Sequence, residues 1–444
     1  MTLIKTIGLI TAAVTGLALT PKAAAQENAP LVNKEETANV IEAVGDLLQN
    51  NYIFPEVADQ IADLLSQKYQ AGSYGDISSP HALAQQLTKD LQSISHDLHL
   101  RVFFDPKRVA SIRAQAAAEP DPQVAIDEFR QEQSRNFGFK SVEILSGNIG
   151  YIDLRHFSST GAAGSTLAAT MKYVENTDAL IFDLRNNGGG SPNMVQHMIS
   201  YLLDEEPMLL SSIFKRPERI TKQYWNLPHV SGTRMPEKKV YVLTSGSTFS
   251  AAEDFSYTLK HLKRATIVGE TTGGGAHPGG RQVATDRFLV WLPTARTINP
   301  VTQTNWEGTG VIPHVETSAE DAFTKAYRLA LENGIAEHPE NSAQKEWSLQ
   351  SLIATSQPIT LPEGLLKQYA GKYGPRVLSY EGGRLYYQRG EGRKRPLTAI
   401  NETLFMVDGL DDFRIGIVVE GGNVIAIQGV SDDGRISQNA KEAS

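Results

Sequence analysis

The sequence contains no cysteine in its 444 residues. This absence excludes disulfide bonds, thiolate catalysis, cysteine-ligated zinc and a lipid-modified cysteine at a processed N-terminus. Positive charge is also in deficit, because 42 Lys and Arg face 50 Asp and Glu and leave a net charge of −8. Such a balance argues against a protein that binds nucleic acids or anionic membranes. After the first 25 residues, no stretch approaches 18 consecutive apolar residues, so the sequence predicts no membrane span in the mature chain.

The first 25 residues have the pattern of a secretory signal peptide. Lys5 supplies a positive n-region, and an apolar stretch from Thr6 to Thr20 is too short to cross a bilayer comfortably. Ala23 to Ala25 fits the rule of small residues at a cleavage site, which predicts a cut after Ala25. An uncleaved anchor is the alternative. We therefore expect an exported protein, periplasmic or secreted in a bacterial context.

The chain is organised around the stretch from Asp178 to Pro192, DALIFDLRNNGGGSP. Its apolar start predicts a buried strand, and Ser191 and Pro192 predict the beginning of a helix. Between them lie Gly188, Gly189 and Gly190, whose lack of a Cβ lets backbone N–H groups converge on one concavity. Such a turn can bind a phosphate or a transient oxyanion. A tight strand-to-helix turn without chemistry is the alternative.

A second strand-turn-helix unit runs from Tyr241 to Leu259, YVLTSGSTFSAAEDFSYTL. Ser250 stands at the mouth of its helix, where the hydroxyl lies beside free backbone N–H groups and the positive end of the helix dipole. This position suits a nucleophile. It also suits a helix N-cap, because serine is among the best capping residues.

Pattern changes along the chain predict five segments: a signal peptide (1–25), a helical module (26–140), an α/β core (141–335), a linker (336–360) and an all-β accessory domain (361–444). Apolar residues recur at helical spacing from Glu35 to about Gln70 and again after Pro80. From Val142 onward strands and helices alternate, which indicates an α/β core. After Leu361 the pattern becomes short strands separated by glycine turns.

Four motifs in this order, FDLRNNGGGSP, TSGSTFSAAEDF, VGETTGGGAHPGG and NWEGTGVIPHVE, resemble the tail-specific protease and tricorn-core family of serine peptidases, family S41. The resemblance spans roughly Glu36 to Asn333. It implies a ClpP/crotonase-like spiral of β-β-α units in the core. Many members carry a PDZ domain before the core, but the segment from Asp105 to Phe139 is shorter than the ~50 residues that a domain needs. We therefore expect no PDZ domain here.

The resemblance also implies a mechanism. The branch that uses a Ser–Lys dyad has its lysine in a segment that aligns with Gly269 to Ala276, and Gly275 stands at that position. A glycine cannot accept a proton, which excludes the dyad and leaves the tricorn type with a histidine and a glutamate. On this reading Ser250 is the nucleophile, His99 the general base, and Glu307 orients the base or the substrate amine.

The remaining site residues follow from the same reading. The oxyanion hole is formed by the backbone N–H of Gly189, in the turn that includes Gly188 and Gly190, and by that of Ala251, the residue after Ser250. His277 is the reserve base, and Glu253 is a helix-dipole partner that could also touch the site. His96 is the weaker histidine of the same loop as His99, and Leu98 replaces the serine that precedes the histidine in the tricorn branch. An ordinary histidine base predicts activity that rises between about pH 6 and 7.

Two other functions remain open. A non-catalytic carrier is possible, because the retinoid-binding proteins of the eye resemble the helical module and core. A crotonase-like acyl-CoA enzyme is the third possibility, which export away from CoA disfavours. The sequence contains no metal-binding cluster or nucleotide loop, so we expect no cofactor and a peptide or protein as the substrate.

Overall fold

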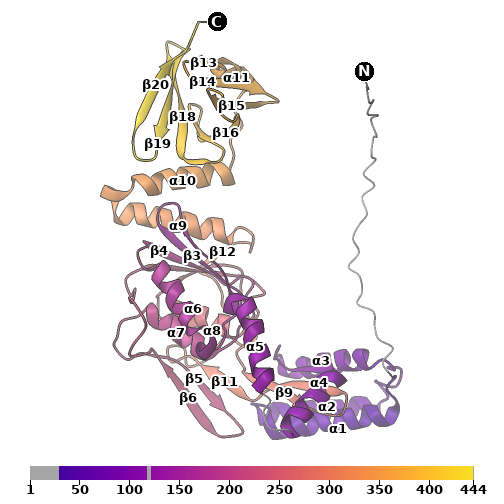
Figure 1. Ribbon diagram of the computed structural model, residues 1–444. Helices are drawn as coiled ribbons and strands as arrows, with labels where there is room; N and C mark the ends of the chain where they lie inside the picture. Colours follow the sequence, from indigo (N-terminus) through magenta and orange to yellow (C-terminus); the bar gives the residue numbers. More distant parts are fainter. Residues whose placement is uncertain (1–29, 118–121, 444) are drawn as a thin grey trace, which may run out of the picture.

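The structure is a computed structural model that describes residues 30–117 and 122–443. The predicted signal peptide lies outside the described residues. Figure 1 shows three modules: a helical module near the N-terminus, a central α/β core and a β-rich module at the C-terminal end. This arrangement confirms the predicted fold class. Over the described residues, no helix combines the length and apolar character that a membrane span requires.

The helical module consists of three helices packed on a small antiparallel sheet. The helices are α1 (Lys34–Asn51), α2 (Pro55–Gln70) and α3 (Pro80–Ser95). The sheet has the order β1-β10-β9, formed by Arg101–Phe104, Phe288–Pro293 and Gly279–Val283. Val102, Val290 and Leu292 lie on one face of the sheet, and this face packs against the helices in an apolar core. Two strands of the core segment therefore complete the N-terminal module, a pairing that joins the two modules tightly.

The core is a six-stranded sheet with the order β12-β8-β7-β4-β3-β2. Its strands are β2 (Phe139–Leu145), β3 (Ile149–Leu154), β4 (Ala179–Asp183), β7 (Lys239–Thr244), β8 (Thr266–Gly269) and β12 (Val315–Glu316). β2 is antiparallel to β3, and the other neighbours are parallel. The carboxyl ends of β4 and β7 are therefore at one edge, which is where ligands bind in open α/β sheets.

Alternating side chains of β4 fix the layers. Leu180 and Phe182 face a core shared with α6 (Thr160–Tyr173), α7 (Pro192–Tyr201) and α8 (Ala251–His261). Ala179 and Ile181 face the opposite core, which α9 (Ala322–Glu337) covers. Helices thus cover both sides of a mainly parallel sheet, as its continuous apolar strands require. The remaining elements before α9 are α4 (Pro106–Ala117), α5 (Pro122–Ser134), η1 (Asn136–Gly138), β5 (Leu209–Lys215), β6 (Ile220–Trp225) and β11 (Ala295–Ile298).

The segment 336–360, predicted as a linker, is instead largely structured. It contains η2 (Pro339–Asn341) and the helix α10 (Ala343–Ser356), which lies beside α9 in Figure 1. Lys345 of α10 pairs with Asp178 of the core at 2.6 Å. The buried guanidinium of Arg414 stacks on Trp347 of α10, with 3.6 Å between its Cζ and the ring centroid. These contacts order a segment whose polar composition alone indicates a loop.

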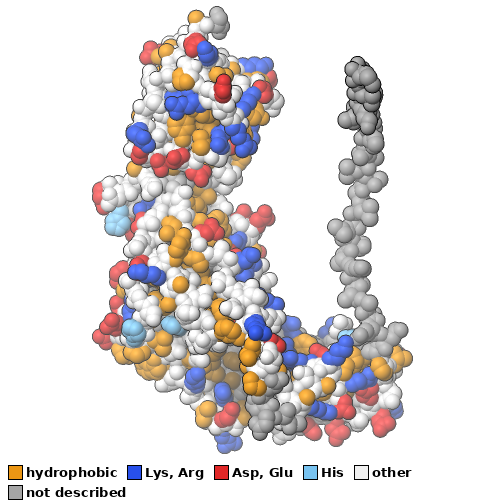
Figure 2. Space-filling model, in the orientation of Figure 1, with side chains coloured by type: hydrophobic (Ala, Val, Ile, Leu, Met, Phe, Trp, Pro, Cys, Tyr) orange, Lys and Arg blue, Asp and Glu red, His pale blue; other side chains and the backbone are white. Residues whose placement is uncertain are grey.

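The C-terminal module is an eight-stranded antiparallel sheet in which consecutive strands are neighbours. Its elements are α11 (Glu363–Tyr369), β13 (Gly371–Tyr373), β14 (Arg376–Glu381), β15 (Arg384–Arg389), β16 (Arg395–Ala399), β17 (Leu404–Val407), β18 (Leu410–Glu420), β19 (Asn423–Ser431) and β20 (Ile436–Ala440). Glu442 N donates to Lys372 O at 2.8 Å, so the chain after β20 meets β13 and the sheet curls into a barrel. On the face shown in Figure 2, acidic and basic side chains are interspersed over all three modules.

Candidate active site

Ser250 lies on a strained turn between β7 and α8. Its backbone has φ 55° and ψ −120°, a region that residues with a Cβ rarely adopt. Such strain persists only where the surroundings enforce it, and here Phe249 N donates to Asn187 O while Ser250 N donates to Glu253 Oε2 at 2.8 Å. A serine on a sharp strand-to-helix turn is the arrangement that presents the nucleophile of α/β-hydrolases.

The glycine turn and the serine turn meet, as the sequence predicts. Gly189 has φ 108°, and a Cβ on it would lie 2.8 Å from Ser250 Cβ and 3.0 Å from Ala251 N. Gly190 has φ 138°, and a Cβ there would lie 2.2 Å from the carbonyl oxygen of Phe157. Both positions therefore require glycine, one for contact with the serine and the other for contact with the backbone.

Some backbone N–H groups of the two turns are hydrogen-bonded and others are not. Gly189 N donates to Asn187 Oδ1 at 2.9 Å, so this predicted oxyanion donor is already bonded. Among the described residues, the N–H groups of Gly188, Gly190 and Ala251 have no hydrogen-bond partner. The available donors beside Ser250 are thus Ala251 and the other two glycines.

Glu253 is fully buried and joins the serine turn to the loop that follows β8. Its Oε2 accepts from Ser250 N and from Gly275 N, and its Oε1 accepts from Gly274 N at 2.7 Å and Thr272 Oγ1 at 2.5 Å. Burial raises the pKa of this carboxyl. With four donors on two oxygens, Glu253 positions the loop 272–275 against Ser250 rather than facing a substrate.

His99 lies in the loop between α3 and β1. Its ring centroid is 4.5 Å from that of Phe249, the residue before Ser250, and its side chain is 10% exposed. Its Nδ1 has no hydrogen-bond partner and lies 3.9 Å from Asp97 Oδ1. Burial lowers the pKa of His99 to about 4, although the neighbouring Asp97 acts in the opposite direction. The imidazole is therefore neutral near pH 7, as a general base must be.

His277 is buried on the far side of Asp97. Its Nδ1 is 2.9 Å from Asp97 Oδ2 and 3.3 Å from Glu307 Oε2, and its ring makes an edge contact with Phe54. The imidazole thus lies between the two carboxylates and is hydrogen-bonded to that of Asp97. Its ring nitrogen is thus committed within the protein, in contrast to that of His99. The third histidine, His96, is an exposed left-handed C-cap of α3.

Glu307 completes the cluster. Its Oε2 accepts from Ala276 N at 2.5 Å, whereas its Oε1 is buried without a hydrogen-bond partner. One ligand atom from each of Asp97, His99 and Glu307 lies within 4.8 Å of the others. Burial, followed by the charge of Asp97, raises the pKa of Glu307. One nitrogen and two carboxylates are donors that a divalent transition metal accepts, but hydrogen bonds already use most of the carboxylate oxygens.

Asp97 is the site residue that sequence reasoning did not single out. It is fully buried. Its carboxylate accepts hydrogen bonds from His99 N at 3.0 Å and Tyr52 OH at 3.2 Å, and it is also hydrogen-bonded to His277 Nδ1. Its signal in the sequence was its place two residues before His99. Lys260, on the helix that follows Ser250, donates through its Nζ to the carbonyl oxygen of Ile312.

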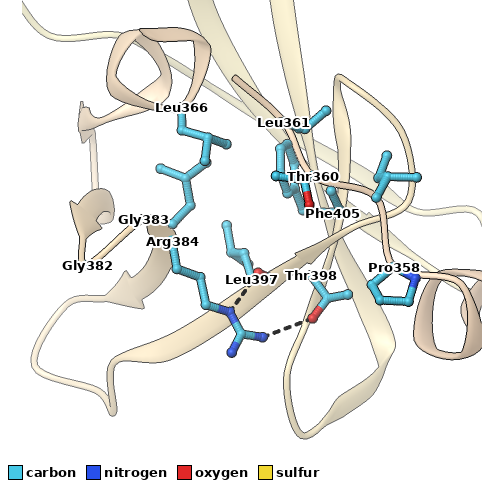
Figure 3. Close-up of a pocket in the computed structure, with 13 residues that line it drawn as sticks. Pro358, Thr360, Leu361, Leu366, Gly382, Gly383, Arg384, Leu397, Thr398 and Phe405 are labelled. Atoms are coloured by element: carbon cyan, nitrogen blue, oxygen red, sulfur yellow. Dashed lines mark hydrogen bonds between the residues drawn. The ribbon is translucent and has the colours of Figure 1, made fainter. Parts of the chain in front are cut away.

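A cavity of about 460 Å³ opens beside this cluster, between the loop of His99 and the turn before Ser250. A second cavity, of about 420 Å³, lies in the C-terminal module. Figure 3 shows that its walls are mainly aliphatic and that Arg384 is bonded to Leu397 and Thr398. Among its described lining residues there is no histidine, aspartate or glutamate.

Comparisons with known proteins agree on one family. Residues 148–317 match the model of peptidase family S41, and residues 25–140 match the N-terminal domain of peptidase S41 in eukaryotic IRBP. A curated relative, the carboxy-terminal processing protease CtpA of Bacillus subtilis, is 27% identical over 132 residues, 30% of this chain. The chain covers 27% of the length of that relative.

Solved structures with a similar chain path include two peptidases. The photosystem II D1 C-terminal processing protease has a TM-score of 0.40 and 18% identity, and the match covers 65% of this chain and 94% of that one. A putative peptidase from Parabacteroides merdae has a TM-score of 0.47 and 20% identity, with 66% and 96% covered.

Proposed function

The chain belongs to peptidase family S41, and we propose that it is an exported serine peptidase that cleaves peptides or protein C-termini. Ser250 is the nucleophile and His99 the general base. Asp97, which accepts from His99 N, stabilises the imidazolium that forms, Glu307 orients the base or the substrate amine, and Ala251 N–H with a glycine-turn N–H binds the oxyanion. The strained backbone of Ser250, placed against Gly189, is the observation that carries this proposal.

The reaction follows from these positions. Ser250 Oγ attacks the scissile carbonyl and its proton passes to His99, which then gives a proton to the leaving amine. Negative charge develops on the carbonyl oxygen, beside donors that no other group of the described chain uses. Water repeats the attack on the acyl-enzyme and releases the second product.

Labelling with a fluorophosphonate tests the proposal directly, because only an activated serine reacts. We expect one adduct, on Ser250, and a loss of at least about 10³-fold in kcat for Ser250→Ala. Ser256→Ala is the matched control, since its hydroxyl on the same helix bonds to Ala252 O. An unlabelled wild type, or turnover that survives in Ser250→Ala, contradicts the proposal.

A non-catalytic carrier is the second candidate, favoured by the match of residues 25–140 to the IRBP domain. A carrier has no need of an activated serine, so it predicts no adduct in the same experiment. It also predicts that a hydrophobic ligand binds equally well to wild type and Ser250→Ala.

A further inference from the structure

The cavity beside His99 has an aromatic and cationic wall that the proposed catalytic steps do not use. Its lining includes Leu98, His99, Arg101, Phe103, Phe249 and Trp291. Leu98 and Phe103 are 37% and 38% exposed, high values for large apolar side chains. An exposed apolar surface next to a reactive serine is a place where part of a substrate can pack.

Strand register places an arginine on either side of Trp291, and of these three residues Arg101 and Trp291 line the cavity while Arg281 lies next to them on β9. Arg101 of β1 is paired with Trp291 of β10, and Trp291 is paired with Arg281 of β9. Directly paired residues point to the same face of a sheet. The alternate positions, Val102 and Val290 among them, face the apolar core on the other side. Arg101, Trp291 and Arg281, here called the Arg-Trp-Arg row, therefore share the open face.

Among the described residues, the Arg-Trp-Arg row has no acidic partner, and one of its polar atoms has no partner at all. Trp291 Nε1 is buried without a hydrogen-bond partner. Arg101 Nε donates to Leu98 O, and Arg281 Cζ lies 5.3 Å from the centroid of the Trp291 ring. Within the described chain, neither guanidinium has an acidic group within 4.0 Å. Both arginines are exposed, so their guanidinium N–H groups are accessible to an anion from outside the protein.

Nearby acids do not fill this role. Asp97 lies beneath His99 and is occupied by Tyr52 and His277. Glu270, which contacts the cavity through Gly246, accepts from the backbone N–H groups of Gly246 and Ala319. Arg101 and His99 both line the cavity, and the charge of Arg101 also lowers the pKa of His99.

We propose that the Arg-Trp-Arg row binds a carboxylate of the peptide substrate while Leu98, Phe103 and Phe249 pack against an adjacent apolar side chain. That the bound peptide is a substrate rests on the proposed function, whereas the binding of a carboxylate does not. A guanidinium matches a carboxylate with two parallel hydrogen bonds, and the indole N–H supplies another donor. The carboxylate comes from the C-terminus of the peptide or from an Asp or Glu side chain.

Binding to Ser250→Ala protein tests the row without turnover. A peptide pool rich in leucine and phenylalanine is prepared in four forms, with a C-terminal acid or amide and with Asp or Asn at one internal position. We expect at least one carboxylate form to bind roughly 10-fold more tightly than the neutral form, as charge-assisted hydrogen bonds imply. A preference for the acid over the amide identifies the C-terminus, and a preference for Asp over Asn identifies a side chain.

Substitutions assign the effect to the row. Arg101→Gln and Arg281→Gln, each in the Ser250→Ala protein, should lose most of the carboxylate preference, and Trp291→Phe part of it. Arg435→Gln is the charge-matched control, because this exposed arginine lies in the C-terminal module beside Asp433. Equal affinity for all four peptides, or a preference that both arginine variants retain, overturns the inference. Carboxylate binding without hydrolysis by wild type refutes the peptidase and leaves the row intact.

Discussion

The cavity beside His99 and the cavity of the C-terminal module have nearly the same volume but different chemistry. In the C-terminal cavity the one charged lining group, Arg384, is bonded to Asp408 Oδ2 at 2.9 Å and Thr398 Oγ1 at 3.0 Å. In the core cavity and the cluster beneath it, His99 Nδ1, Glu307 Oε1 and Trp291 Nε1 are buried without partners. Unsatisfied polar atoms, rather than size, therefore distinguish the cavity suited to catalysis.

The C-terminal module also has buried atoms without partners, but of a different kind. Arg376 Nε and Arg414 Nε belong to guanidiniums whose other nitrogens are bonded, to Ser437 and Asn439 in one case and to Gln350, Trp347 and Ser351 in the other. These arginines fasten strands and α10 together. These buried polar groups thus hold the module together, which fits the accessory role that the sequence predicts.

Removing the proposed base should give the largest difference between the two cavities. We expect His99→Ala to lower kcat/KM by at least about 10³-fold, because His99 is the proposed acceptor of the serine proton. Arg384→Ala in the C-terminal cavity should leave kcat/KM within about twofold of wild type, since a remote surface ion pair affects catalysis little. Peptide hydrolysis under single-turnover conditions measures both. Comparable losses in the two variants would mean that the C-terminal cavity takes part in the reaction.

Removing His277 should affect stability more than any change in the C-terminal cavity. His277→Ala leaves Asp97 and Glu307 buried without the imidazole that they share, so we expect the free energy of unfolding to fall by about 3 kcal/mol. Arg384→Ala should cost less than about 1 kcal/mol, because both members of its ion pair are more than a third exposed. Urea unfolding at pH 7 measures the difference. A stable His277→Ala protein that no longer hydrolyses peptides would instead make His277 the base.

The local signals in the sequence located the two turns correctly. Strand formers followed by Gly188 to Gly190, and a serine before an amphipathic helix, are patterns that neighbouring residues determine. The meeting of Gly189 with Ser250 followed from the parallel pairing of β4 with β7, which brings their carboxyl ends together. The helical module and the β-rich C-terminal segment were predictable for the same reason.

Features that depend on distant contacts were not predictable. The pattern of residues 336–360 predicts a linker, whereas the helix α10 in this segment is stabilised by Asp178 and Arg414, which lie far away in the sequence. Three features of the site depend on how the folded chain packs. They are the hydrogen-bonded N–H of Gly189, the buried carboxylate of Asp97 and the lowered pKa of His99. The Arg-Trp-Arg row depends on the register of three strands, and Arg281 and Trp291 lie 180 and 190 residues after Arg101.

Filling the space of Gly275 should disturb the site through packing alone. A Cβ at this position would lie 2.2 Å from Phe249 Cζ and 2.7 Å from His99 Cε1, so Gly275→Ala must displace the proposed base. We expect kcat/KM to fall by about 10- to 100-fold, since a shift of about 1 Å can cost this much. Gly364→Ala, in the helix beside the C-terminal barrel, meets no atom within 4 Å and should have no effect. Unchanged kinetics in Gly275→Ala would place His99 outside the reaction.

The smallest expected effect is the pH dependence of kcat/KM between pH 6 and 7, and it separates a buried base from an exposed one. A histidine with an ordinary pKa near 6.5 becomes about threefold more neutral over this interval. Because burial lowers the pKa of His99 to about 4, its ring is already neutral at pH 6, and we expect a change of less than about twofold. The loss should appear instead as the pH falls through about 4, where protonation removes the base. Arg384→Ala should reproduce this profile, because the C-terminal cavity has no lining group, among its described residues, that titrates in the range. A rise centred between pH 6 and 7 would show that the working base is more exposed than His99.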